Sequence, residues 1–124
     1  MRLVITEKNF CDWAAVHVAR RILEAKPTKE KPFVLGLPTG GTPVNMYKRL
    51  VQFYKDGILS FENVVTFNMD EYVGLEPSNE QSYYNYMHTN LFDHVDIKPE
   101  NINMLNGMAT DYKAECERYE EKIK

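Results

Sequence analysis

A glycine-rich turn is the first stretch of this sequence whose residue types and spacing could do chemistry. The apolar run FVLGL, residues 33–37, leads into PTGGTP, residues 38–43, where two adjacent glycines stand between two threonines. If this turn opens a helix near Pro43, the free backbone N–H groups there point at one spot, where the helix dipole also favours an anion. Glycine lets the backbone approach phosphate oxygens closely. The candidate phosphate-binding residues are Gly41 and Thr42, followed by Thr39 and Gly40.

Two interpretations of this turn remain open on the residue pattern. One is an anion-binding loop, and the other is a tight turn in which Thr42 caps the helix that follows. The turn is neither a Walker loop nor a dinucleotide-binding fingerprint, because no Lys-Ser/Thr pair follows it and the pattern G-x-G-x-x-G is absent.

A second candidate is a pair of adjacent carboxylates after the apolar run VVTFNM, residues 64–69. Asp70 and Glu71 follow directly, and because successive side chains of a strand point to opposite faces, only one of them is expected to face a crevice. A carboxylate beside a bound phosphate suits a general base, since charge repulsion and partial desolvation raise its pKa. The alternative on pattern alone is a loop acid that caps the following turn.

Both motifs depend on strands and helices that bring them together. Apolar periodicity and turn residues predict strands at residues 2–5, 33–37, 64–69 and 101–105, and helices at residues 9–26, from about 43 to 57, around 80–92 and from 112 to 124. The second and third strands have the composition of strands buried on both faces. This alternation predicts an α/β layer fold with a mostly parallel sheet, in which ligands bind at the carboxyl ends of the strands.

Composition excludes several classes of partner. With 15 basic and 18 acidic side chains and a formal charge of -3, the chain has no basic field for nucleic acid or an anionic membrane surface. It has no secretory h-region and no apolar run of membrane-spanning length, so we expect a reduced, cytoplasmic setting with Cys11 and Cys116 as buried small hydrophobes. Three scattered histidines without close Cys/His spacing argue against a metal site.

Five segments taken together resemble the glucosamine-6-phosphate deaminase (isomerising) family, in order and in separation: FVLGLPTGGTP, VVTFNMDEYVGL, SYYNYM, LFDHVDI and AECERYEEKI. The resemblance implies a Rossmann-like three-layer fold and conversion of glucosamine 6-phosphate and water to fructose 6-phosphate and ammonia, without a metal or redox cofactor. The implied protein is a hydrolase of amino-sugar catabolism that is homo-oligomeric at full length. The resemblance also implies that Gly41 and Thr42 bind the sugar phosphate and that Asp70 moves the proton between C2 and C1. Glu71 is a second-rank candidate for a supporting role.

The chain departs from that family at its end. The last helical segment reaches Lys124 without a glycine, asparagine or proline to close it, and the family's DGHIAFNEP-type motif, which supplies the ring-opening groups, has no counterpart here. We therefore expect residues 1–124 to be the N-terminal part of a single domain that is inactive alone. Two alternatives are a non-catalytic sugar-phosphate sensor, which the intact NMDEY counts against, and a related sugar-phosphate lactonase or isomerase.

Overall fold

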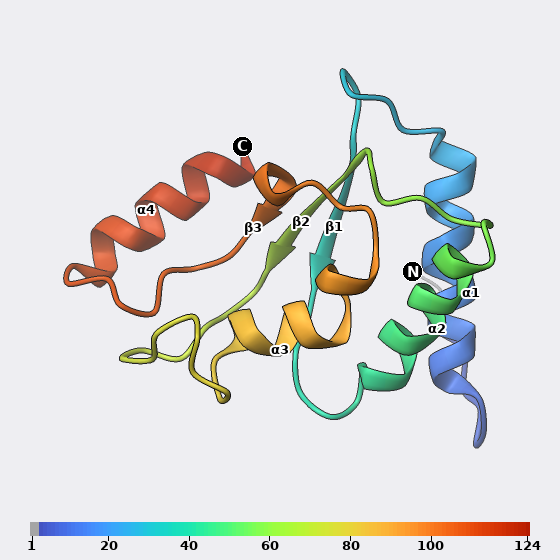
Figure 1. The fold of residues 1–124 in the computed structure, drawn as a ribbon, viewed down its shortest axis with the longest axis horizontal. Coiled ribbons are helices and arrows are strands. Elements are labelled where there is room, and N and C mark those ends of the chain that lie inside the picture. Colours follow the sequence, from blue (N-terminus) through green and yellow to red (C-terminus); the bar gives the residue numbers. More distant parts are fainter. Residues whose placement is uncertain (1–2) are drawn as a thin grey trace.

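The computed structural model describes residues 3–124 and contains a three-stranded parallel sheet. Its strands are β1 (Phe33–Leu37), β2 (Val64–Asn68) and β3 (Ile102–Asn103), and they lie side by side in that order, as Figure 1 shows. The register pairs Leu37 with Asn68 and Phe67 with Asn103, so the carboxyl ends of all three strands lie at one edge of the sheet. The predicted α/β class with a parallel sheet is confirmed.

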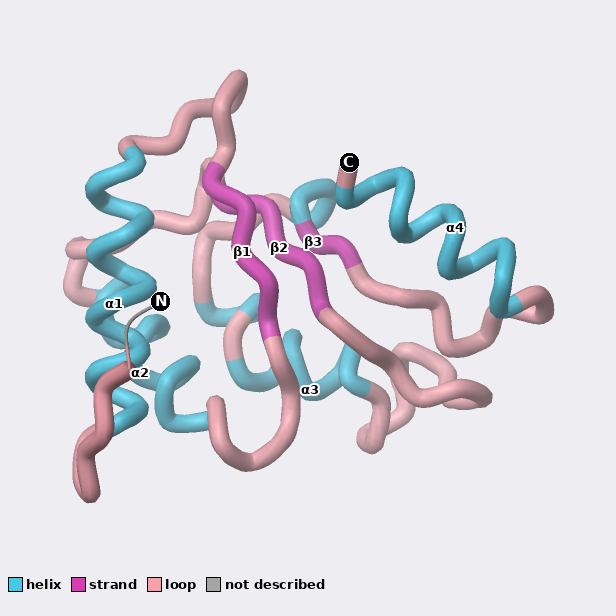
Figure 2. The backbone as a smooth tube through the Cα atoms, turned by 180° about the vertical axis from the view of Figure 1, so that it is seen from behind, coloured by secondary structure: helices cyan, strands magenta, loops and turns pink. Residues whose placement is uncertain are grey.

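The helices flank the sheet on two sides. In both views α1 and α2 lie next to each other beyond β1, and α4 lies at the other side of the molecule, towards β3 (Figures 1 and 2). Short 3-10 turns complete the connection between the third helix and β3. The bounds are α1 Phe10–Ala25, α2 Val44–Lys55, α3 Tyr83–Asn90, α4 Tyr112–Ile123, η1 Phe92–His94 and η2 Pro99–Asn101.

Residue types explain where the helices begin and end. α1 ends at Ala25, with Lys26 as its C-cap just before Pro27, and α2 is followed by Gly57 at a φ of 75°, a left-handed conformation in which glycine is favoured. The predicted stop of α2 at Gly57 is therefore confirmed. The side chains of Ser82 and Asp111 cap α3 and α4 by accepting hydrogen bonds from backbone N–H groups three residues later, at 3.0 and 3.1 Å.

One apolar core joins α1, α2 and one face of the sheet. It contains side chains that recur every three or four residues along α1 and α2 and every second residue along β1, as amphipathic elements require. Its fully buried members include Ala15, Ile22, Tyr47, Leu50, Leu37, Val64, Phe61, Met87 and Leu91. The core thus fixes the position of α2, and with it the start of that helix after the glycine-rich turn.

The first predicted strand is wrong. Residues 3–5 form no strand, and the side chains of Leu3 and Ile5 are 78 % and 86 % exposed, while Arg2 lies outside the described residues. A strand needs a neighbour for its backbone hydrogen bonds, and among residues 3–124 this segment has none.

Burial on both faces is also wrong for β1. Its side chains alternate, and Val34 is 61 % exposed because no helix within residues 3–124 covers that face of the strand. The expected burial of both cysteines fails in a similar way, since Cys116 is exposed and Cys11 is half-buried. On α4 only Tyr119 is buried, so the side of that helix carrying Cys116 has no covering layer in the described structure.

Candidate functional site

The two predicted motifs leave the sheet at the same edge. Leu37 and Asn68 are the last residues of β1 and β2 and are partners in the register, so the turn 38–43 and the segment beginning at Met69 both start from the carboxyl ends of adjacent strands. The topology therefore brings Asp70 and the glycine-rich turn to one end of the sheet, as the sequence predicts for a ligand site.

The glycine-rich turn exposes its backbone to solvent. Gly40 has a φ of 97°, a conformation that L side chains rarely adopt, whereas Gly41 lies outside that region and a Cβ placed on it would meet nothing within 4 Å. Within residues 3–124, no acceptor hydrogen-bonds to the backbone N–H groups of Gly41 and Thr42, and both residues are exposed. Pro43 occupies the cap position of α2 without a side-chain hydrogen bond, so Thr42 does not cap the helix.

Side-chain donors hold three alternate carbonyl groups of this turn. The Tyr47 hydroxyl donates to the carbonyl oxygen of Pro38, the Tyr86 hydroxyl donates to that of Gly40 at 2.6 Å, and the Cys11 thiol lies 3.4 Å from that of Thr42. Burial raises the pKa of the Tyr47 hydroxyl, and a smaller degree of burial raises that of Tyr86, so both phenols keep the proton that they donate.

Sequence reasoning missed these tyrosines. Their rings also pack edge to face, with centroids 6.4 Å apart. For Tyr47 the missed signal is that a buried tyrosine hydroxyl usually finds a hydrogen-bond acceptor, and a turn without regular structure offers free carbonyl groups.

Asp70 lies at the edge of the sheet, with its carboxylate open to solvent. It follows β2 by two residues, it is exposed, and within residues 3–124 its carboxylate makes no hydrogen bond or ion pair. A hydrogen bond with Tyr83 raises the pKa of the Tyr72 hydroxyl most, and the negative charge of Asp70 adds to this effect. Within residues 3–124 the Asp70 carboxylate thus influences Tyr72 through its charge alone and is not held by a hydrogen bond or an ion pair.

Glu71 is the member of the acidic pair that caps a neighbouring element, which is the alternative that the sequence left open. Its carboxylate accepts hydrogen bonds from the backbone N–H groups of Tyr83 and Tyr84 at 2.8 and 2.9 Å, and from that of Tyr72 at 2.9 Å. The first two are the free amides of the first turn of α3, where a negative charge is favoured. Glu71 therefore helps to cap α3, whereas Asp70 is exposed.

Buried amide side chains fix the strand ends from which these segments leave. Asn68 donates to the carbonyl oxygen of Leu37 at 3.3 Å and Asn103 donates to that of Thr66 at 3.1 Å, so each bridges two neighbouring strands. The Tyr119 hydroxyl on α4 contacts the carbonyl oxygens of Asn68 and Asn103 at 2.6 and 2.9 Å, and burial raises its pKa to about 12. Hydrogen bonds from β1 through β2 and β3 to α4 therefore hold the end of the sheet that leads to Asp70.

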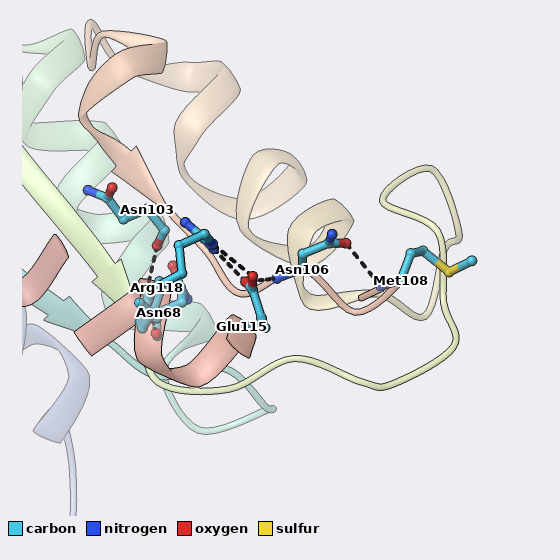
Figure 3. A network of polar contacts seen from close by, with 7 residues as sticks. Asn68, Asn103, Asn106, Met108, Glu115 and Arg118 are labelled. Carbon is cyan, nitrogen blue, oxygen red and sulfur yellow. Dashed lines mark hydrogen bonds and ion pairs between the residues drawn. The ribbon is translucent and has the colours of Figure 1, made fainter. Parts of the chain in front are cut away.

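The segment between β3 and α4 supports the loop that carries Asp70. In Figure 3 the Glu115 carboxylate binds Arg118 and also accepts a 2.8 Å hydrogen bond from the backbone N–H of Asn106. One residue further on, Gly107 accepts a 2.8 Å hydrogen bond from the Gly74 backbone, and a Cβ on Gly107 would lie 2.2 Å from the Tyr72 carbonyl oxygen. The loop after Asp70 thus rests directly on a backbone that only glycine can provide.

Two further findings bear on the class of site. Among residues 3–124, no three His, Cys, Asp or Glu side chains gather in a way that could hold a metal ion. No helix in this part of the chain combines the length and apolar character needed to cross a membrane.

Comparison with known proteins identifies relatives along the whole chain. A family model described as glucosamine-6-phosphate isomerases/6-phosphogluconolactonase matches residues 6–124. The glucosamine-6-phosphate deaminase of Fusobacterium nucleatum is 60 % identical over 124 residues, which are 99 % of this chain and 45 % of the relative. That of Yersinia pseudotuberculosis is 64 % identical over 112 residues, covering 90 % of this chain and 42 % of the relative. The chain thus spans less than half the length of these curated relatives.

Solved structures agree on the fold. A glucosamine-6-phosphate deaminase described as monomeric superposes with a TM-score of 0.87 and 39 % identity, covering 97 % of this chain and 48 % of that protein. The 6-phosphogluconolactonase of Thermotoga maritima, at 18 % identity and a TM-score of 0.76, covers 97 % of this chain and 52 % of that protein and shows the shared fold alone.

The comparisons also correct the class of enzyme expected from the sequence. The term hydrolase is wrong, because the relatives are named as deaminases and the family description speaks of isomerases. The resemblance to the deaminase family itself is confirmed by the family model over residues 6–124 and by the identities of 60 % and 64 %. This chain belongs to the glucosamine-6-phosphate isomerase/6-phosphogluconolactonase family.

Proposed function

We propose that residues 1–124 are the N-terminal part of a single-domain glucosamine-6-phosphate deaminase. The full-length protein would convert glucosamine 6-phosphate and water to fructose 6-phosphate and ammonia. The observation that carries this proposal is the placement, at one edge of a parallel sheet, of an exposed glycine-rich turn and of an Asp70 carboxylate that has no partner among the described residues. The similarity to curated deaminases at 60 % and 64 % identity supports the deaminase reaction over the lactonase reaction.

The turn would bind the phosphate group through its backbone. Gly41 and Thr42 are exposed, their N–H groups have no acceptor within the described residues, and the start of α2 adds the positive end of a helix dipole. Thr39 and Gly40 are second-rank candidates for binding the phosphate in the same turn. Because the chain has an acidic balance of charges, local donors of this kind are the feature that would hold an anion here.

Asp70 would act as the general base once the sugar ring is open. Its carboxylate takes the proton from C2 of the open aldose, which gives an enolamine, and returns a proton to C1. The resulting imine at C2 reacts with water, so the C–N bond breaks and ammonia leaves as the ketone forms. These steps move protons and exchange nitrogen for oxygen without electron transfer, so the proposed reaction requires no redox cofactor. The groups that open the ring are proposed to lie beyond Lys124.

The test measures ammonia release from glucosamine 6-phosphate by the full-length protein, beside hydrogen exchange at C2 in deuterated buffer. The proposal expects both activities. A sugar-phosphate sensor would bind the substrate without either activity, and a lactonase would open 6-phosphogluconolactone and release no ammonia. Either result would contradict the proposal.

Two properties of the full-length protein belong to the same proposal. A cytoplasmic setting is supported by the presence of both cysteines as free thiols. We also propose a homo-oligomer, although one solved relative is described as monomeric, so sedimentation of the full-length protein would decide the point.

A further inference from the structure

We infer that the Tyr86 hydroxyl is a positioning group for phosphate, because it fixes the direction of the Gly41 N–H through the carbonyl group of Gly40. This inference rests on the proposed function, in which that N–H binds the phosphate of the substrate. It assigns a role in substrate affinity to a side chain from α3, a helix that lies outside the phosphate-binding turn.

The geometry follows from the planarity of the peptide bond. The carbonyl group of Gly40 and the N–H of Gly41 belong to one peptide unit, and in a trans peptide they point in opposite directions. The described residues contain no cis peptide bond. Since Tyr86 holds the Gly40 carbonyl oxygen at 2.6 Å, the Gly41 N–H must point away from Tyr86.

This peptide unit needs such a restraint. It lies between two glycines, which have the widest choice of backbone conformations, and a Cβ at either position would meet nothing within 4 Å. Packing therefore does not hold the Gly40–Gly41 peptide, and the Tyr86 hydroxyl is its hydrogen-bond partner within residues 3–124. A peptide fixed before the ligand arrives binds more tightly than one that must be ordered on binding.

Contacts with neighbouring tyrosines, and contacts of its helix with the loop that carries Asp70, fix the position of Tyr86. Its ring packs edge to face on Tyr47 and on Tyr83, with centroids 6.4 and 6.5 Å away. It lies on α3, whose first turn is capped by Glu71, the neighbour of the proposed base. Helix α3 thus links the loop of Asp70 to the phosphate-binding turn, and through Tyr86 it sets how the turn faces the substrate.

The matched variants are Tyr86→Phe and Tyr84→Phe in the full-length protein. Each removes one hydroxyl oxygen from the same helix, but the exposed Tyr84 ring stacks on His88 and its hydroxyl has no hydrogen-bond partner within residues 3–124. Tyr86→Phe should raise KM for glucosamine 6-phosphate and weaken competitive inhibition by inorganic phosphate, each by about three- to tenfold, as expected for one lost hydrogen bond. The kcat should stay within about twofold, because the hydroxyl does not touch the reacting carbons. Tyr84→Phe should leave all three values unchanged.

The outcomes separate this inference from the proposed function. If the parent protein releases ammonia and Tyr86→Phe keeps the parental KM and phosphate inhibition, the positioning role is wrong and the proposed function stands. A lower melting temperature with unchanged phosphate inhibition would likewise reduce Tyr86 to a structural role. If the parent shows neither ammonia release nor phosphate binding, the proposed function fails and the inference fails with it.

Discussion

Asp70 and Glu71 are adjacent in sequence, yet the Glu71 carboxylate accepts backbone hydrogen bonds at the start of α3 while the Asp70 carboxylate has no partner within residues 3–124. The two acids therefore differ in what their removal should do. Glu71 supports the loop and the helix after it, and Asp70 is available for a substrate.

Asp70→Asn should lower kcat by about a hundredfold or more with little change in KM, because asparagine keeps the shape of the side chain but cannot accept the proton from C2. Ammonia release and exchange of the C2 proton in deuterated buffer should fall together. Exchange at the parental rate in Asp70→Asn would mean that another residue is the base.

Glu71→Gln should act on stability more than on chemistry. Glutamine retains one acceptor oxygen but loses the charge that favours the first turn of α3, so the free energy of unfolding should fall by about 1 kcal/mol. The kcat should remain within a few-fold of the parent. Urea unfolding and steady-state kinetics on the same preparations separate the two effects, and a loss of kcat equal to that of Asp70→Asn would contradict this division of roles.

The elements with strong local signals could be predicted from the sequence. Helices α1 and α2 follow from the spacing of apolar side chains, and β1 and β2 from apolar runs that end in turn residues. The glycine-rich turn and Asp70 could be placed at one edge because parallel strands with helical crossovers leave no other arrangement for their carboxyl ends. These features depend on residues that are close together in the chain.

What could not be predicted depends on residues far apart in the chain. Residues 2–5 have the composition of a strand, but a strand also needs a partner that composition does not reveal. The contact between Tyr86 and Gly40 joins positions 46 residues apart, and the bonds from Glu71 to α3 cross 12 and 13 residues. Nothing in the local pattern around Tyr86 distinguishes a hydroxyl with an acceptor from one in solvent.

The two glycines of the turn should respond differently to substitution. Gly41→Val should keep the fold, because a Cβ there meets nothing within 4 Å. Its branched side chain would occupy the space proposed for the phosphate oxygens, so KM for glucosamine 6-phosphate should rise. Gly40→Ala places an alanine at a φ of 97° and should lower the free energy of unfolding by about 1–2 kcal/mol. Unchanged substrate affinity in a folded Gly41→Val protein would make the stretch a plain turn.

The 124-residue chain alone should show no deaminase activity, because the groups proposed to open the sugar ring are absent and the closed ring has no acidic C2 proton. It should also self-associate, since Val34 on β1 and the apolar side chains of Phe10 and Trp13 on α1 are exposed. Ammonia assays and sedimentation of the purified chain test both points. A monodisperse monomer that turns over substrate would contradict the proposal that residues 1–124 are part of a larger domain.

Acid should destabilise the full-length protein partly through Glu115. Its hydrogen bonds with Arg118, and then with the Asn106 backbone, lower the pKa of this carboxyl from 4.5 to about 2, and its side chain is only 12 % exposed. A pKa that is lower in the folded state means that the unfolded state binds the proton first. The contribution of Glu115 is therefore complete above about pH 4.5 and is lost as the pH falls towards 2. Glu115→Gln should lower the free energy of unfolding at pH 7 and should reduce the loss of stability between pH 5 and 2, as measured by urea unfolding at each pH.

Glu117→Gln on the same helix is the control, because the 3.9 Å ion pair of Glu117 with Lys113 is exposed and should contribute little. Equal pH profiles for the two variants would mean that Glu115 does not hold the segment that supports the loop of Asp70.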